Sequence, residues 1–271
     1  MPPAQDKLIG ASGSLLVLIP VSNGTTLFYE SLAPYLAPHF RVLLYDRRGY
    51  HRSRTDNRPS KEELYITHAS DVAALIRHVS SSPAECDTEP AFVFTSFASS
   101  GVATELLLNH PHLVHAIVLH EPALTPLIPG ALGVKIRQKG TDIVSKGQSE
   151  DLRGANAIIN SLLYTDAELQ LFKACPVFAQ VPAVFKLADM VYYLVTEIPA
   201  TRDYLPDLTR LKGEVGREET GVLARMPGEV LAGVLGVAVG LAPGGHVGYV
   251  TDAREFAEYL RRVLVGGEAR L

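Results

Sequence analysis

Short, uninterrupted runs of apolar residues recur along the chain. They fall at residues 15–19, 42–45, 91–94, 116–119 and 237–241. A strand with one face in water alternates apolar and polar residues, whereas continuous runs of four or five are typical of strands covered on both faces. The pattern therefore predicts an open, mainly parallel sheet buried between layers.

Helical spacing fills the intervals between these runs, at residues 26–36, 68–79, 102–110 and 252–264. In the second of them, Val72, Leu75, Ile76 and Val79 share one face. Strands that alternate with helices predict an α/β fold with right-handed crossovers, about six mainly parallel strands and helices on both faces.

The alternation stops after Pro122. From there to about residue 206 the pattern is helical throughout, with candidate helices at 134–146, 151–163, 167–174 and 184–195. We expect a core at residues 1–122 and 207–271 and a helical cap at 123–206. Ligands bind at the carboxyl ends of strands in such sheets, so the cap would cover the site. Large side chains of the cap are pocket candidates, above all Phe172, Phe185 and Tyr192, with Phe178, Met190 and Tyr193.

Composition narrows the class of protein. Of 271 residues, 47% are hydrophobic and 20% charged, which is ordinary for a globular enzyme and excludes a disordered chain or a coiled coil. A net charge of −4 argues against nucleic acid as a partner. Two cysteines, Cys86 and Cys175, build no disulfide scaffold, and no spacing indicates a metal or another cofactor.

The sequence offers no targeting or membrane signal. Residues 1–7 lack a basic start followed by an apolar run, and the longest weakly polar stretch, 230–243, falls short of the roughly 20 residues of a bilayer span. We therefore expect a cytoplasmic protein without a membrane partner. The oligomeric state stays open, with a homodimer as one option.

Four stretches, in order along the chain, resemble the α/β-hydrolase fold. They are LIPVSNG (18–24), YDRRGYHRS (45–53), AIVLHEP (116–122) and PGGHVGY (243–249), the last followed by an amphipathic helix. The chain is most similar to small capped lactonases and esterases, including the zearalenone-degrading lactonases. The two N-terminal strands usual in that family look shortened or missing.

The resemblance also locates a substitution. Hydrolases of this fold place a nucleophilic serine in the pattern Gly-x-Ser-x-Gly, where the glycines permit a tight strand-to-helix turn. Here the corresponding residues 95–101 read TSFASSG. The following helix sets the register, which puts Phe97 at the nucleophile position and Thr95 and Ser99 at the glycine positions. Phenylalanine has no proton to lose and forms no acyl-enzyme.

A second register remains open. A two-residue slip would make Ser99 the nucleophile and keep Gly101 as the last glycine, and Ser96 is a weaker alternative. Otherwise these serines serve as helix N-caps.

The partner residues of a catalytic site look intact. His246 follows two glycines, where the family has its catalytic base. An acid must orient such a base, and two compete. Glu121 follows the strand at 116–119, as in the lactonases, while Glu218 occupies the region in which most other hydrolases place their aspartate. We favour Glu121.

Further polar groups are candidates for the same cavity. Backbone N–H groups of Ser22 and Ala98 correspond to the family's oxyanion donors. His51 follows the turn of the second stretch and is either a surface or a catalytic histidine.

A base, an acid and oxyanion donors without a nucleophile favour proton transfer over covalent catalysis. The first hypothesis is therefore a cofactor-free lyase, dehydratase, isomerase or cyclase. It would act on an apolar, carbonyl-containing small molecule, as in secondary metabolism. The second is an ester or lactone hydrolase that uses Ser99, Ser96 or activated water. The third is an inactive hydrolase fold that binds a ligand.

Overall fold

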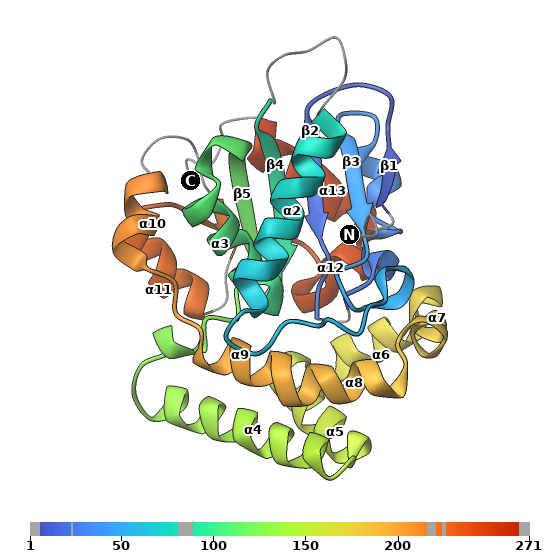
Figure 1. Cartoon of the computed structure of the whole chain (residues 1–271), viewed down its shortest axis with the longest axis vertical. Coiled ribbons are helices and arrows are strands. Elements are labelled where there is room, and N and C mark those ends of the chain that lie inside the picture. The colour runs from blue at the N-terminus through green and yellow to red at the C-terminus, as the bar shows by residue number, and fades with distance from the viewer. Residues whose placement is uncertain (1–5, 23, 81–88, 216–220, 224–225, 266–271) are drawn as a thin grey trace.

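The computed structural model describes residues 6–22, 24–80, 89–215, 221–223 and 226–265. Within these ranges the strands form one seven-stranded sheet in the order β1-β3-β2-β4-β5-β6-β7, shown in Figure 1. The strands are β1 (Asp6–Ile9), β2 (Leu15–Ile19), β3 (Arg41–Tyr45), β4 (Ala91–Ser96), β5 (Val114–His120), β6 (Gly221–Leu223) and β7 (Val239–Gly240). All neighbours pair in parallel except β1 and β3.

The sequence predicts the central strands of the sheet better than β1 and β7, the strands at its two edges. Of the two N-terminal strands expected to be shortened or missing, the described residues contain β1, a strand of four residues that pairs antiparallel with β3. Its sequence, DKLI, is half polar and therefore carries no apolar run. The predicted strand at 237–241 shortens to the two residues of β7.

Helices cover both faces of the sheet. On one face lie α2 (Leu64–Ser80), α3 (Ser100–Asn109), α10 (Leu208–Val215) and α11 (Met226–Leu235); on the other lie α1 (Ala33–Leu36), α12 (Gly248–Thr251) and α13 (Ala253–Val265). Alternate residues of β2 divide between the two cores: Leu15, Val17 and Ile19 face the first, and Leu16 and Leu18 the second. This two-sided burial explains the continuous apolar runs.

The stretch from residue 123 to 206 is helical and contains no strand. Its helices gather below the sheet in Figure 1. They are α4 (Gly130–Gln148), α5 (Leu152–Leu163), α6 (Asp166–Ala174), α7 (Pro176–Val184), α8 (Leu187–Tyr192), a π-helical turn (Tyr193–Glu197) and α9 (Ile198–Asp203). The division of the chain into two core pieces and a cap stays a prediction.

No helix in the described ranges is by itself long and apolar enough to cross a membrane. Helix α7 and the segment Leu187–Asp203, bent by 93° from one another, meet that length and composition only when taken together.

Candidate active site

The turn between β4 and α3 presents a phenylalanine. Strand β4 ends at Ser96, and Phe97 then adopts a φ of +54°, a left-handed conformation that is uncommon outside glycine. The chain enters α3 three residues later. Thr95 and Ser99 flank the turn and are almost completely buried. The tight turn therefore forms without the two glycines that the sequence pattern of hydrolases suggested it needs.

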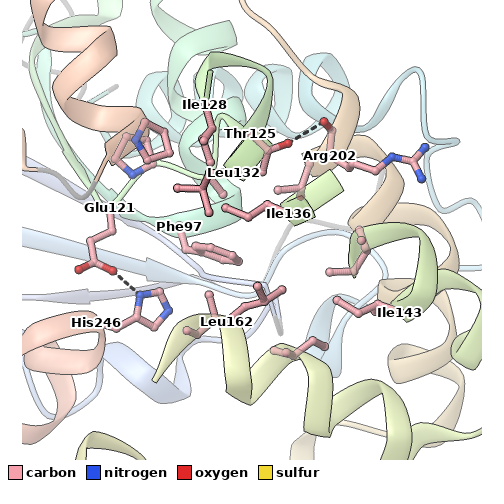
Figure 2. Close-up of a pocket in the computed structure, with 18 of the residues that line it drawn as sticks. Phe97, Glu121, Thr125, Ile128, Leu132, Ile136, Ile143, Leu162, Arg202 and His246 are labelled. Carbon is pink, nitrogen blue, oxygen red and sulfur yellow. Dashed lines mark hydrogen bonds and ion pairs between the residues drawn. The ribbon is translucent and has the colours of Figure 1, made fainter. Parts of the chain in front are cut away.

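Two predicted site residues meet beside this turn. Glu121 follows β5 with a φ of +45°, and His246 lies in the turn Gly245–Val247 beyond β7. The His246 Nδ1 and the Glu121 Oε2 are 2.5 Å apart, as the dashed line in Figure 2 shows. His246 is 4% exposed. This contact leaves the other ring nitrogen, Nε2, for a bound molecule.

Two aromatic rings hold the imidazole in place. The rings of Phe97 and Tyr164 each have their centroid 5.3 Å from that of His246, in edge-to-face geometry. Burial raises the pKa of Tyr164 above its usual value, so this phenol stays protonated. The imidazole therefore has an acid on one nitrogen and aromatic neighbours that fix its plane.

A cavity of about 240 Å³ opens beside Phe97, Glu121 and His246. Figure 2 shows these residues at one side and the aliphatic side chains of α4 and α5 extending away from them. The aliphatic lining consists of Ile128, Leu132, Ile136, Ile143, Ile159, Leu162, Leu163 and Ile198. The sequence reasoning selected aromatic residues and missed these. The spacing of Leu132, Ile136 and Ile143 on one face of α4 was the available signal.

Ser96 and Ser99 point elsewhere. The Ser99 hydroxyl donates to the Pro20 carbonyl oxygen at 2.6 Å, and the Ser96 hydroxyl lies 2.9 Å from the His120 Nδ1. Both serines are at most 1% exposed, and neither lines the cavity. The register that makes Ser99 a nucleophile does not match this geometry, since its hydroxyl is buried against the chain that follows β2.

Of the aromatic pocket candidates, Tyr193 lines this cavity, whereas Phe172, Phe185 and Tyr192 lie outside it. Phe172 stacks on Tyr164 at 5.9 Å, behind the ring that contacts His246. Phe185 stacks on Tyr50, and the Tyr192 hydroxyl donates to a backbone carbonyl oxygen of the core. The prediction that they line the pocket is wrong for this cavity, because they pack between the helices and the core.

The remaining candidates are positioned as follows. The His51 Nδ1 contacts Asp46 at 3.1 Å, and its ring does not line the cavity. Ser22 is half-buried and Ala98 is 6% exposed; neither lines the cavity, so their role as oxyanion donors stays a prediction. Glu218 lies outside the described residues and comes before β6 in the chain.

One cavity residue connects to the loop that carries Ser22. Tyr193 lines the cavity and opens the π-helical turn. Burial raises the pKa of Tyr193 to about 12, while a hydrogen bond with the Ser22 side chain opposes the rise. The phenol is therefore protonated near neutral pH and is able to donate a hydrogen bond.

A buried ion pair lies at the other end of the same turn. The Arg47 Nη2 donates to the Glu197 Oε2 at 2.9 Å, and both side chains are 2% exposed. The Tyr50 hydroxyl donates to the second carboxylate oxygen at 2.7 Å. Burial alone would lower the pKa of Arg47, but the charge of Glu197 raises it overall. Arg47 also donates to the carbonyl oxygen of Ser22 at 3.2 Å, so it ties this loop to the helices.

The described part of the chain contains no group of three or more His, Cys, Asp or Glu side chains that could hold a metal ion. The side chains of the site that can donate, accept or transfer a proton include the His246 imidazole, the Glu121 carboxylate and the Tyr193 hydroxyl group.

Known proteins with the same architecture include several hydrolases. No protein-family model matches the chain. It is 26% identical over 270 residues to an uncharacterized hydrolase, YraK, of Bacillus subtilis (strain 168), covering 94% of this chain and 90% of that protein. A hydrolase from Pseudomonas aeruginosa PA01 superposes with a TM-score of 0.70 at 21% identity, over 96% of this chain and 93% of that one.

The enol-lactonase from Burkholderia xenovorans LB400 is similar to the same degree. Its TM-score is 0.70 at 17% identity, over 96% of this chain and 95% of that one. Together with the sheet order, these likenesses show that the chain has the α/β-hydrolase fold, as the sequence predicts.

Proposed function

We propose that the chain is an enzyme that transfers protons without a covalent intermediate, with His246 as the base and Glu121 as its orienting acid. Its substrate is an apolar, carbonyl-containing small molecule in the cavity, and residues 123–206 serve as the cap. The reaction is of the lyase, dehydratase, isomerase or cyclase type. The single observation that carries the proposal is Phe97 beside His246, at the turn where hydrolases present their nucleophile.

The proton path follows from the hydrogen bond. Since Glu121 accepts from Nδ1, the neutral imidazole keeps its lone pair on Nε2, which faces the bound molecule. Nε2 takes a proton from the carbon next to the carbonyl group, and the electron pair moves onto the carbonyl oxygen as an enolate. The imidazolium that forms is stabilised by the Glu121 carboxylate, and it later returns the proton to carbon or to a leaving group.

The developing negative charge on oxygen needs hydrogen-bond donors. The Tyr193 phenol is one, because it lines the cavity and stays protonated. The backbone N–H groups of Ser22 and Ala98 are the others that we propose. A donor of this kind typically contributes about 2.7–4 kcal/mol of transition-state stabilisation.

A second candidate function is hydrolysis of an ester or lactone by water that His246 activates. The similarity to a hydrolase of Bacillus subtilis and to an enol-lactonase favours it. In this reaction the proton of water moves to Nε2 while the water oxygen attacks the carbonyl carbon. The bond between that carbon and the ester oxygen then breaks, and the imidazolium returns its proton to the leaving oxygen. It requires no serine, so Phe97 is compatible with it. The third candidate, binding without turnover, uses the same cavity.

Deuterium exchange tests the first proposal without knowledge of the natural substrate. A methyl ketone that binds the protein is incubated in D₂O, and loss of the proton signals next to its carbonyl group is followed by NMR. We expect His246→Ala to slow the exchange by about 10²–10⁴-fold. Glu121→Gln falls between His246→Ala and the unchanged protein, because an amide still accepts a hydrogen bond but carries no charge.

Ser99→Ala is the matched control and retains the exchange rate, since its hydroxyl is bonded to Pro20 outside the cavity. Exchange that persists in His246→Ala contradicts the mechanism. Ester or lactone turnover without exchange selects activated water, and binding with neither reaction selects the ligand-binding function.

A further inference from the structure

The cavity has one polar end. The polar end contains His246 and Glu121, and Figure 2 shows that Leu132, Ile136 and Ile143 lead away from it. From Leu132 to Ile143 helix α4 advances by about 16 Å, at 1.5 Å per residue. The aliphatic lining therefore extends along one face of α4, with His246 and Glu121 at one end of it.

Polar groups along the rest of the lining already have partners within the protein. The Thr125 hydroxyl donates to the Arg202 carbonyl oxygen at 2.7 Å, and the Thr201 hydroxyl donates to the Glu197 carbonyl oxygen at 2.9 Å. The Arg202 guanidinium binds the Asp203 carboxylate at 2.6 and 2.8 Å. A ligand group that needs a hydrogen bond would lose its water here without a replacement, which is costly.

The walls are made of branched aliphatic side chains from α4 and α5. Helix α4 contributes Ile136 and Ile143, and α5 contributes Ile159 and Leu162. These aliphatic side chains suit a flexible hydrocarbon, because they gain from the apolar area that is buried. Unlike the rings of Phe97, Tyr193 and His246 in the same lining, they offer no ring face on which a flat aromatic group would stack. An apolar cavity of roughly 150 Å³ holds benzene, so about 240 Å³ corresponds by volume to about ten carbons.

One lining position of α4 has no side chain. Gly140 is buried and lies between Ile136 and Ile143 on the face toward the cavity. A Cβ placed there would come 3.2 Å from the Arg202 Cδ, which is close but lies in a flexible side chain. Glycine costs an α-helix about 1 kcal/mol relative to alanine. The aliphatic part of the Arg202 side chain occupies the place beside this glycine, so a larger side chain at position 140 must displace Arg202 or extend into the cavity.

We propose that the cavity binds the unbranched alkyl chain of a carbonyl compound, and that Gly140 sets the longest chain that fits. The inference rests on the proposed function for the position of the carbonyl group, at His246. The chain then runs along α4 toward Ile143, and its far end carries no polar group.

Calorimetric titration with methyl ketones of six to fourteen carbons tests this. We expect affinity to rise about fourfold for each added methylene until the cavity is full, and to level off near ten carbons. In Gly140→Leu the limit falls by several carbons, and Gly140→Ala gives a smaller shift in a more stable helix. Gly233→Leu is the matched control: it is the same exchange on α11, where an added Cβ meets nothing within 4 Å. In Gly233→Leu we expect affinity to level off at the same chain length as in the unchanged protein.

If affinity levels off at the same chain length in Gly140→Leu, in Gly140→Ala and in the unchanged protein, the proposal is overturned. It is also overturned if 4-phenylbutan-2-one binds as tightly as decan-2-one, which has the same number of carbons. Since binding is measured separately from deuterium exchange, the two proposals fail separately. A length limit without exchange refutes proton transfer alone, and exchange without a length limit refutes the alkyl site alone.

Discussion

Phe97 is held in a backbone conformation that costs a non-glycine residue about 1–2 kcal/mol. The surroundings offset this cost, since the ring packs against His246 and lines the cavity. The strain is therefore retained although this side chain cannot act as a nucleophile. The turn is in place for a serine, and only the side chain differs.

Replacing Phe97 by serine tests that statement. Because the turn forms without glycine at positions 95 and 99, the new hydroxyl is expected to lie beside the His246 ring. Phe97→Ser should react with a fluorophosphonate probe, whereas the unchanged protein should not. The adduct is measured by intact-protein mass spectrometry.

Two variants sharpen this test. Phe97→Ser combined with His246→Ala should lose the reaction, because no base remains to take the proton. Labelling of the unchanged protein at Ser99 would instead support the serine-hydrolase hypothesis, and an unreactive Phe97→Ser would show that the turn does not present residue 97 to the base.

At the scale of elements, the π-helical turn Tyr193–Glu197 joins the cavity to the core. Its first residue lines the cavity and its last holds Arg47, which in turn binds the carbonyl oxygen of Ser22. Turns of this kind occur frequently at functional sites. The Arg47–Glu197 pair and the hydrogen bond between Tyr193 and Ser22 both connect this turn to the loop after β2.

Removing one partner of this pair should be costly. We expect Glu197→Ala to lower the free energy of unfolding in urea by about 3–5 kcal/mol, because it leaves the Arg47 charge buried and unpaired. Lys61→Ala breaks the exposed pair of Lys61 with Asp203 and should cost less than about 1 kcal/mol. Equal losses in the two variants would mean that burial does not strengthen the inner pair.

Sequence patterns predict elements better than they predict contacts. The carboxyl ends of parallel strands lie at the same edge of a sheet. Because Glu121 and His246 each follow such a strand, the sequence alone was enough to predict that they meet. The helix predicted at 134–146 is present as α4, which extends over Gly130–Gln148. The spacing of Leu132, Ile136 and Ile143 indicates one apolar face of this helix, but it does not show whether that face borders a cavity or packs in a core, so these residues were missed. A proline accounts for another difference: the predicted helix at 26–36 breaks into a 3₁₀ turn (Thr26–Tyr29) and α1, and Pro34 lies in the first turn of α1.

Over the whole molecule, two apolar cores on opposite faces of the sheet carry the fold. One of them encloses a titratable side chain. His68 of α2 is 1% exposed, and its Nε2 has no hydrogen-bond partner among the described residues. Burial, together with the charges of Arg47 and Arg48, holds its pKa well below the usual 6.5. The native protein therefore keeps this imidazole neutral.

This makes stability depend on pH. Below about pH 6.5 the unfolded chain binds a proton at His68 that the native protein does not, so the free energy of unfolding falls as the pH drops. The slope from one such group is at most about 1.4 kcal/mol per pH unit. We expect the melting temperature to decrease between about pH 8 and about pH 5, and to decrease less in His68→Leu than in the unchanged protein.

His39→Gln serves as the comparison, because His39 is exposed. The melting temperature of His39→Gln should decrease between about pH 8 and about pH 5 by as much as that of the unchanged protein. The same decrease in His68→Leu would mean that other groups govern stability in acid.

The phenylalanine at the turn after β4 also has a pharmacological consequence. An inhibitor that reacts with a nucleophilic serine stays attached through a covalent bond to the serine oxygen, so its dissociation no longer limits its effect. Here residue 97 offers no such atom, and the hydroxyl groups of Ser96 and Ser99 are buried. An inhibitor of the cavity therefore acts only while it is bound. The duration of its action is then set by its residence time, so a long-acting inhibitor needs a slow rate of dissociation.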